Sequence, residues 1–253
     1  MGIQQNMGSM EGKEIRIGSV ASAYWSIATT VISTGSVNSM HDSFMPLSGM
    51  FQLPGMMVNA FYGSVGVGFL KFYIFIILAV FISDLMVGRM PEFLGKKIEA
   101  REMKIAMMFA LLHPLLILTG TGIASYLFAN NPTAYAGWLN NPGYHGFSEM
   151  LYEFTSSSAN NGSGFEGLGD NTPFWNIVCG IVMMLAGYLP IIGPVAIAGS
   201  LAAKKYIPES AGTLKTNTFT FGLMVFAVIA LVATLSFLPA LALGPITEYF
   251  SLK

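Results

Sequence analysis

The stretch Ser156-Ser157-Ser158-Ala159-Asn160-Asn161-Gly162-Ser163-Gly164 decides how this chain must fold. It is an uncharged run of small polar residues and glycine within a very apolar protein. Such residues cannot build a packed core, and an irregular polar segment is tolerated at membrane depth only where it is buried in protein or lines water. The run therefore predicts a wet, functional loop between apolar segments.

The composition is that of an integral membrane protein. Hydrophobic residues make up 53% of the 253 residues and charged residues 10%, against about 25% charged residues in an ordinary soluble domain. The mean hydropathy is +0.61. A net charge of −1 argues against nucleic acid as a partner, because nothing in the chain would neutralise a run of phosphates.

Four segments are long and apolar enough to cross a bilayer, for which about 20 residues suffice. They are 61–88, 105–128, 174–203 and 219–243. The connections 89–104 and 204–215 carry lysine or arginine, whereas the segments 33–60 and 129–173 carry neither. The positive-inside rule therefore predicts that the two basic connections are cytoplasmic and that both ends of the chain lie outside.

Two shorter segments, 19–32 and 148–157, are too short and too polar to span a membrane. Each lies on the side without basic residues and immediately precedes a small polar run with glycine. Ser19 and Ser148 are the expected N-caps. We interpret both segments as re-entrant half-helices that enter and leave the membrane on one face.

The two regions repeat each other when Gly35 is set against Gly162. A half-helix, a polar loop with glycine, an acidic residue, a long span and a basic exit follow in the same order twice. Repetition of such units is how many membrane transporters are built. Two related pore-forming units are therefore expected, and the separation of Gly35 from Gly162 defines the repeat spacing.

The loops have the chemistry of a filter for a monovalent cation. A half-helix aims the negative end of its dipole at the membrane centre, and glycine lets carbonyl oxygens turn toward an ion. Neutral side chains add oxygen ligands without a fixed charge that would hold the ion too tightly. Two ordinary polar turns are the alternative. The predicted ion-binding residues are Ser33, Thr34, Gly35 and Ser36 in one loop and Asn160, Asn161, Gly162 and Ser163 in the other.

The span 61–88 is unusual because Gly63, Gly66 and Gly68 precede Lys71. Closely spaced glycines weaken a helix, and an intramembrane lysine is costly unless it faces water or a partner. These four residues predict an unwound gate below the first loop. The alternative is that the lysine extends to the outer interface while the glycines permit close packing.

Two further kinds of site are alternatives for the histidines. Ser163 between two glycines, with His145 or His113 as base, would suit an intramembrane serine hydrolase. His145 and Glu149 are spaced to share one helix face and bind a metal, although His145 is expected to precede that helix. His113, before a proline, is expected to be a satisfied interior histidine at a kink.

Several motifs carry a family resemblance. They are 29–35, Met40-His41-Asp42-Ser43, Gly88-Arg89-Met90-Pro91-Glu92-Phe93-Leu94-Gly95-Lys96-Lys97-Ile98, Asn141-Pro142-Gly143-Tyr144-His145-Gly146-Phe147-Ser148-Glu149, Ala159-Asn160-Asn161-Gly162-Ser163, and Pro239-Ala240-Leu241-Ala242-Leu243-Gly244-Pro245. Together they resemble the potassium-binding A subunit of the Kdp potassium-transporting ATPase, over residues 10–251.

The resemblance implies the all-α integral membrane fold of the potassium-transporter superfamily. A whole subunit would hold four span–pore-helix–span repeats and one extra helix at each end. This chain would hold two of the four. Residues 1–104 would be the third repeat without its first span, 105–216 the complete fourth repeat, and 217–253 a terminal transmembrane helix with an outer tail. Thr34 replaces a more usual cysteine, and Lys71 replaces a more usual small residue.

The family function implied is potassium binding and translocation within an ATP-driven, high-affinity uptake complex of a prokaryotic cell membrane. K+ would bind the residues of the third and fourth filters. The chain has no phosphate-binding lysine loop and no aspartyl-phosphorylation motif, so ATP would act only through a partner. The implied partners are the catalytic B subunit, the C subunit, a small F-type subunit, the N-terminal half of the A subunit and membrane lipid. A secondary cation transporter and a non-conducting assembly fragment are the alternatives.

Overall fold

The computed structural model describes residues 17–60, 63, 66–208 and 215–252, and nearly all of its regular structure is helical. The helices are α1 (Gly18–Val31), η2 (His41–Ser43), α2 (Pro46–Met50), α3 (Gln52–Val58), α4 (Val67–Met86), α5 (Ala100–Ala110), α6 (Leu112–Asn130), α7 (Tyr144–Ala159), α8 (Pro173–Ala202), α9 (Phe219–Leu241), the π-helical turn η3 (Ala242–Ile246) and α10 (Thr247–Ser251). A two-residue antiparallel pair, β1 (Glu92–Phe93) and β2 (Lys96–Lys97), makes up the only named strands in this part of the chain. The prediction of an all-α fold is confirmed.

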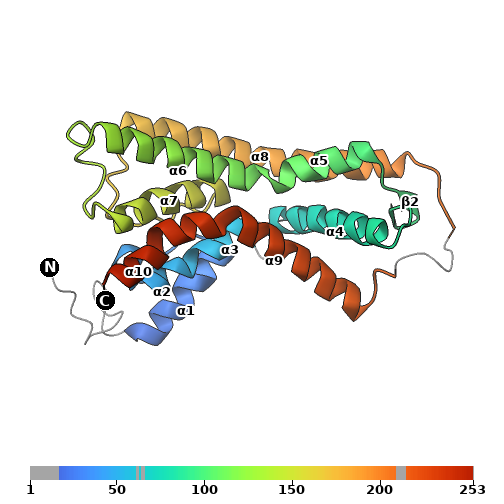
Figure 1. Ribbon diagram of the computed structural model, residues 1–253, viewed down its shortest axis with the longest axis horizontal. Helices are drawn as coiled ribbons and strands as arrows, with labels where there is room; N and C mark the ends of the chain where they lie inside the picture. The colour runs from blue at the N-terminus through green and yellow to red at the C-terminus, as the bar shows by residue number, and fades with distance from the viewer. Residues whose placement is uncertain (1–16, 61–62, 64–65, 209–214, 253) are drawn as a thin grey trace.

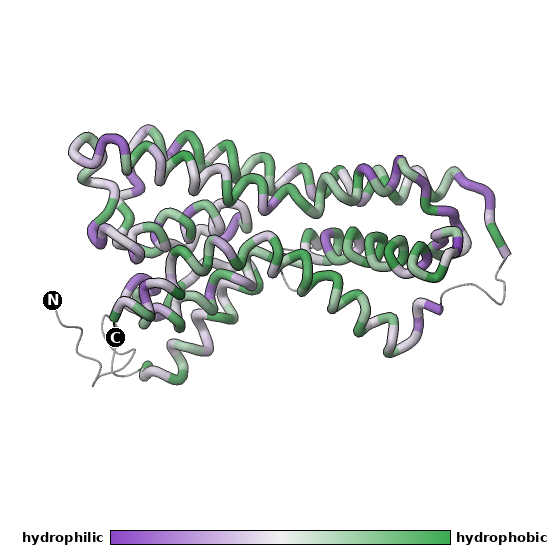
Figure 2. Tube along the Cα trace, in the orientation of Figure 1, coloured by the Kyte–Doolittle hydropathy of each residue, from purple (hydrophilic) through white to green (hydrophobic). Residues whose placement is uncertain are grey.

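Four helical stretches are long and apolar enough to cross a membrane. They are Val67–Met86, Ala100–Asn130, Pro173–Ala202 and Phe219–Ser251. Figure 1 shows the first three running along the long axis of the molecule and the fourth, α9 with α10, bent and oblique to it. Figure 2 shows that hydrophobic residues predominate on them. All four predicted spans are thus helical. The predicted start of the first span, Phe61, lies outside the described residues.

Helices α1 and α7 are the two half-helices. Figure 1 shows both beginning near the end of the molecule where the termini lie and ending in its middle. The predicted start of α7 is wrong by one helical turn, because the helix begins at Tyr144 after Gly143, which has a φ of 106°. Ser148 is not a cap: its hydroxyl donates to the Tyr144 carbonyl at 3.1 Å. The start of α1 likewise has no side-chain cap.

The helical segment that follows each loop begins at a proline, Pro46 in α2 and Pro173 in α8, and these prolines are separated by the repeat spacing. Proline is well suited to the first turn of a helix, where its missing N–H is not needed. Helix α8 continues for 30 residues with Pro190 and Pro194 inside it. The corresponding span of the first unit is divided into α2, α3 and α4. Helices α2 and α3 are absent from the sequence-based prediction, which took this stretch as an outer connection.

At the end of the molecule that carries β1 and β2, ion pairs join the start of α5 to the end of α8. Lys204, just after α8, lies 2.7 Å from Glu102 and 3.1 Å from Glu99 at the start of α5. Glu102 is fully buried and also accepts a hydrogen bond from Ser200 at 2.5 Å. Of the three charged side chains only Glu102 is buried, so removing Lys204 would leave a buried carboxylate without its cation, which is costly. The pair fixes the ends of α5 and α8 to each other.

Close packing between α6 and α7 predicts a stability difference between two neighbouring glycines. A Cβ at Gly120 would overlap the Phe154 ring, whereas a Cβ at Gly122 would have no atom within 4 Å. Gly120→Ala should therefore lower the free energy of unfolding by about 1–3 kcal/mol, whereas Gly122→Ala should leave it unchanged or raise it slightly. Thermal unfolding of the purified protein in detergent measures both, and equal midpoints in the two variants would contradict this packing.

Candidate functional site

The two polar loops, 33–36 and 160–163, have the same backbone. Ser33 and Asn160, which are not glycine, adopt left-handed φ values of 58° and 56°. Two positions later, Gly35 and Gly162 have φ values of 76° and 77°. Left-handed conformations are uncommon outside glycine and tend to mark functional turns. The repeat seen in the sequence therefore extends to individual backbone angles.

The half-helices before these loops also end in the same way. In each, the first residue after the last turn donates to the carbonyl three residues back and the next residue to the carbonyl five residues back. The bonds are Ser33 to Thr30 (3.3 Å), Thr34 to Thr29 (3.0 Å), Asn160 to Ser157 (3.2 Å) and Asn161 to Ser156 (3.2 Å). These bonds use carbonyls that the end of a helix would otherwise leave unpaired.

The two loops meet at Gly35. A Cβ built on this residue would overlap the carbonyl oxygen of Asn161. Any side chain at Gly35 would collide with the opposing backbone, so only glycine permits this approach. The contact brings together loops from two regions far apart in the sequence, at the ends of two helix dipoles that both favour positive charge.

The middle of each second span lies beside a loop. A Cβ at Gly63, between α3 and α4, would lie 3.3 Å from the Ser33 hydroxyl, and one at Gly187, in α8, would lie 3.3 Å from the Asn160 amide oxygen. In the first unit the helix is interrupted here: Asn59 has a left-handed φ of 42° and Gly66 one of 83°. Interrupted helices at membrane depth are found where backbone is buried in protein or lines a cavity.

Lys71 lies in α4, one turn beyond the interruption, and its side chain is only 7% exposed. It lines a cavity of about 30 Å³ with residues of α3, α5, α6, α8 and α9, among them His113, Pro190 and Phe237. The alternative in which this lysine extends to an outer interface is therefore wrong. Within the described part of the chain, its side-chain nitrogen has neither a hydrogen bond nor an ion pair.

The histidines do not form a hydrolase site with Ser163. His113 Nδ1 pairs with the Ser158 hydroxyl at 2.6 Å, but its buried Nε2 has no hydrogen-bond partner among the described residues, so this interior histidine is satisfied at one nitrogen only. The ring nitrogens of His145 pair with carboxylates. The Ser163 hydroxyl instead lies 2.9 Å from the Tyr152 hydroxyl and from the Asn161 amide oxygen. Neither predicted base is bonded to the serine, so that alternative is wrong.

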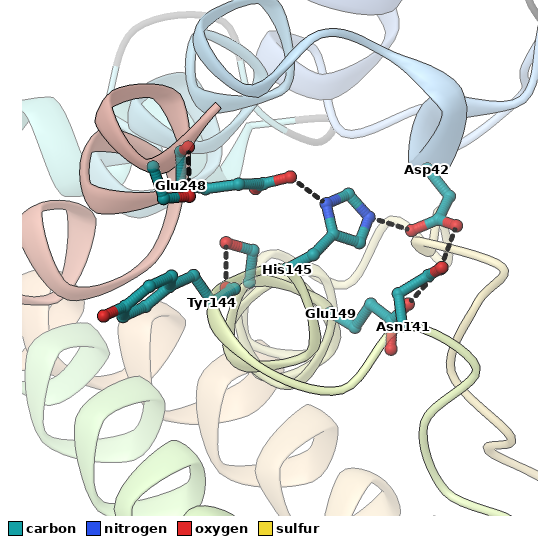
Figure 3. A network of polar contacts seen from close by, with 8 residues as sticks. Asp42, Asn141, Tyr144, His145, Glu149 and Glu248 are labelled. Atoms are coloured by element: carbon teal, nitrogen blue, oxygen red, sulfur yellow. Dashed lines mark hydrogen bonds and ion pairs between the residues drawn. The ribbon is translucent and has the colours of Figure 1, made fainter. Parts of the chain in front are cut away.

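His145 joins three segments at the end of the molecule where the half-helices begin. Its Nε2 lies 2.8 Å from Asp42 of η2 and its Nδ1 lies 2.8 Å from Glu248 of α10. Figure 3 shows the ring held between the two carboxylates. Burial by itself lowers the pKa of His145, but the hydrogen bonds to Asp42 and Glu248 outweigh it and raise the pKa to about 10. The ring is therefore a partly buried imidazolium at neutral pH.

The same cluster bears on the metal alternative. Because α7 begins at Tyr144, His145 is inside the helix and not before it, and it shares one helix face with Glu149. Asp42, His145 and Glu149 offer ligand atoms within 4.8 Å of one another. Asn141 donates to Asp42 at 3.3 Å and to Glu149 at 3.0 Å. Since carboxylates bind both nitrogens of the ring, the arrangement suits an ion-paired histidine better than a neutral metal ligand.

Comparison with known proteins assigns this arrangement to a family. Residues 2–250 match the model of the KdpA family, described as the potassium-transporting ATPase A subunit. The chain belongs to this family. With four apolar helices of spanning length, it is a multi-pass membrane protein of a transporter family.

Individual relatives in the family are close in sequence. The potassium-transporting ATPase potassium-binding subunits of Flavobacterium psychrophilum and Flavobacterium johnsoniae are 72% and 71% identical to this chain. That of Geobacillus kaustophilus is 48% identical. Each match covers 100% of this chain and 45%, 45% and 44% of the respective relative. The chain therefore spans about half the length of the curated relatives it matches.

Several side chains that surround the loops were not predicted. Thr29 donates to the carbonyl of Ser36 at 2.7 Å, and Ser156 donates to the Asn161 amide oxygen at 2.6 Å. Tyr152 is in contact with Ser163, as given above. Thr29 and Ser156 are equivalent positions of the two units, because the repeat spacing separates them as well. Both residues could have been found in the sequence by extending the repeat alignment from the loops back into the half-helices.

The His145 ion pairs predict a pH-dependent stability. The folded pKa is raised above the ordinary value of about 6.5, so the stabilisation is complete below that pH and is lost as the pH rises through about 10. At pH 7, His145→Gln should lower the free energy of unfolding by about 2 kcal/mol, and this loss should shrink to near zero at pH 11. Thermal unfolding in detergent between pH 7 and pH 11 gives the comparison.

The control for this pH series is Glu248→Gln, which keeps the shape but removes one carboxylate. Its loss of stability should also fade as the pH rises through the titration of the ring. A constant difference between wild type and His145→Gln across the whole pH range would show that the ring contributes packing and not charge.

Proposed function

We propose that this chain is the C-terminal part of a potassium-binding subunit and that loops 33–36 and 160–163 are two of its selectivity-filter loops. The observation that carries the proposal is the shared backbone conformation of the two loops, each at the inner end of a half-helix and in contact through Gly35. K+ would lose its water shell to backbone carbonyls of both loops, to the hydroxyls of Ser33, Thr34 and Ser36 and to the amide of Asn160. Asn161 and Ser163 would contribute through their backbone, because their side chains are hydrogen-bonded to each other behind the loop.

The assembly proposed for this chain follows from its number of loops and from its family. Two filter loops supply half of a four-loop pore, so the N-terminal half of the A subunit is the first partner. ATP hydrolysis would belong to a catalytic B subunit, and the C subunit and a small F-type subunit would complete the complex. In a prokaryotic plasma membrane, the basic end with β1 and β2 would be cytoplasmic and both ends of the chain outside. The proposed units are 1–104, 105–216 and 217–253.

Gly162 provides the direct test of the filter. Its φ of 77° strains any other residue, although nothing lies within 4 Å of an added Cβ. Gly162→Asp would add this strain and a fixed charge to the loop, so the K+ concentration that half-saturates ATP hydrolysis by the complete complex should rise about tenfold or more. Gly88→Asp is the matched control, because Gly88 has a φ of 70°, equally open space and a position far from the loops.

The result also separates the alternatives for function. Unchanged K+ affinity in Gly162→Asp would remove this residue from the filter. K+ transport by the subunit without any ATPase partner would favour a secondary cation transporter. A complex that assembles with this chain but binds no K+ in either form would favour an assembly fragment.

We also propose that Gly63, Gly66, Gly68 and Lys71 form a gate below loop 33–36. When protonated, the buried Lys71 side chain would repel a cation that passes the level of its cavity, and the interruption around Gly63 and Gly66 would let the span bend there. Gly68 donates its N–H to the Gly63 carbonyl at 2.9 Å and so ties the helix to the interruption.

Removing the charge at Lys71 tests the gate. Lys71→Met should raise the maximal rate of K+-stimulated ATP hydrolysis about two- to tenfold with little change in half-saturating K+, because a like charge near the path is removed. Lys71→Arg keeps the charge and should retain the wild-type rate. If Met and Arg had the same effect, the charge would have no part in gating.

A further inference from the structure

A chain of buried hydrogen bonds runs behind loop 160–163. His41 Nδ1 lies 2.9 Å from the Tyr152 hydroxyl, which lies 2.9 Å from the Ser163 hydroxyl. Ser163 in turn lies 2.9 Å from the Asn161 amide oxygen. The exposed fractions of His41, Tyr152 and Ser163 are 1%, 0% and 4%. The hydrogen-bond chain therefore connects η2, in the first unit, to the loop of the second unit without contact with solvent.

The contacts are compatible with an arrangement in which every proton in these hydrogen bonds runs toward the loop. The backbone N–H of Ser163 donates to the Asn161 side-chain oxygen at 2.9 Å, which identifies that atom as the acceptor. In this arrangement the hydroxyl proton of Ser163 points to the same oxygen. Tyr152 then donates its proton to Ser163 and accepts one from the Nδ1–H of His41.

The first unit has a counterpart at the corresponding position. The repeat spacing that relates Gly35 to Gly162 also relates Trp25 to Tyr152 and Ser36 to Ser163. The indole N–H of Trp25 donates to the Ser36 carbonyl at 3.0 Å. Each half-helix thus places an aromatic donor two turns before its end, hydrogen-bonded to the fourth residue of the following loop. The contacts differ in kind, because the Trp25 bond is exposed and reaches a backbone carbonyl, whereas the Tyr152 bond is buried and reaches a side-chain hydroxyl.

Tyr152 is itself held in position by stacking. Its ring lies 4.3 Å from that of Phe165 with an interplanar angle of 22°, and Phe165 lies 5.9 Å from the His145 ring at 9°. A buried aromatic ring with few rotatable bonds is a stiff support. A loop held from behind by such a ring resists the small movements that would let it fit an ion of another size.

We propose that Tyr152, oriented by His41, is a positioning residue that sets the ion selectivity of loop 160–163, and that Trp25 does the same for loop 33–36. This inference rests on the proposed function, since it requires the loops to bind the transported ion. Beyond that function, it assigns a role to residues that lie outside the loops and do not contact the ion. It also makes selectivity in one unit depend on a histidine from the other.

Tyr152→Phe removes the hydroxyl and keeps the ring, so it tests the hydrogen bonds alone. In the complete complex we expect the preference for K+ over Rb+ to fall roughly tenfold, while the maximal rate of ATP hydrolysis stays near that of wild type. Half-saturating concentrations of K+ and Rb+ are measured separately. Tyr126→Phe is the matched control, because Tyr126 on α6 is 70% exposed and should leave both values unchanged.

A double-mutant comparison tests whether Tyr152 acts through Ser163. If it does, the double variant Tyr152→Phe/Ser163→Ala should prefer K+ over Rb+ as much as the less selective of the two single variants does. Fully additive losses would overturn that route. Trp25→Phe provides an independent variant if Tyr152→Phe does not assemble, and it should also lower the preference for K+.

Wild-type K+ preference in assembled Tyr152→Phe and Trp25→Phe would overturn the proposal. The failure of the proposed function has a different signature, because Gly162→Asp would then also leave K+ affinity unchanged. If Gly162→Asp weakens K+ binding and the aromatic variants do not alter selectivity, the loops form the filter but are not set by the rings behind them.

Discussion

Two helices that end inside the protein impose the main constraint on this structure. The last turn of α1 and of α7 has carbonyls that no lipid could satisfy, so each must be paired or directed at a polar partner. The left-handed residues Ser33 and Asn160 turn the chain so that some carbonyls are paired, and the dipoles of both helices converge on the loops. The neutral polar composition of the loops, the glycines and the donors behind them all follow from this requirement.

Local features of the fold were predictable because they depend on local chemistry. The apolar spans, the half-helices and the polar loops each have a composition that leaves few alternatives, and the repeat spacing related the two units before any contact was known. Helices α2 and α3 were not predictable in this way, because glycine and proline occur throughout 46–55 and a short helix there depends on tertiary packing.

The parts of the site that could not be predicted depend on distant partners. His145 lies 103 residues from both Asp42 and Glu248, so nothing local indicates that it is an imidazolium held by two carboxylates. The start of α7 was misplaced for a related reason, since the segment before Ser148 has turn-forming residues whose helical conformation is fixed by these contacts. The burial of Lys71 likewise depends on the several helices that surround one cavity.

The position of Glu248 has a consequence for biosynthesis. During translation Asp42 and His145 are made well before Glu248, which emerges 103 residues after the histidine. Until Glu248 is made, the ring can pair with only one of its two carboxylates, Asp42. The ion pair that joins α10 to α7 can therefore form only after both loops and all four long apolar helices have been synthesised.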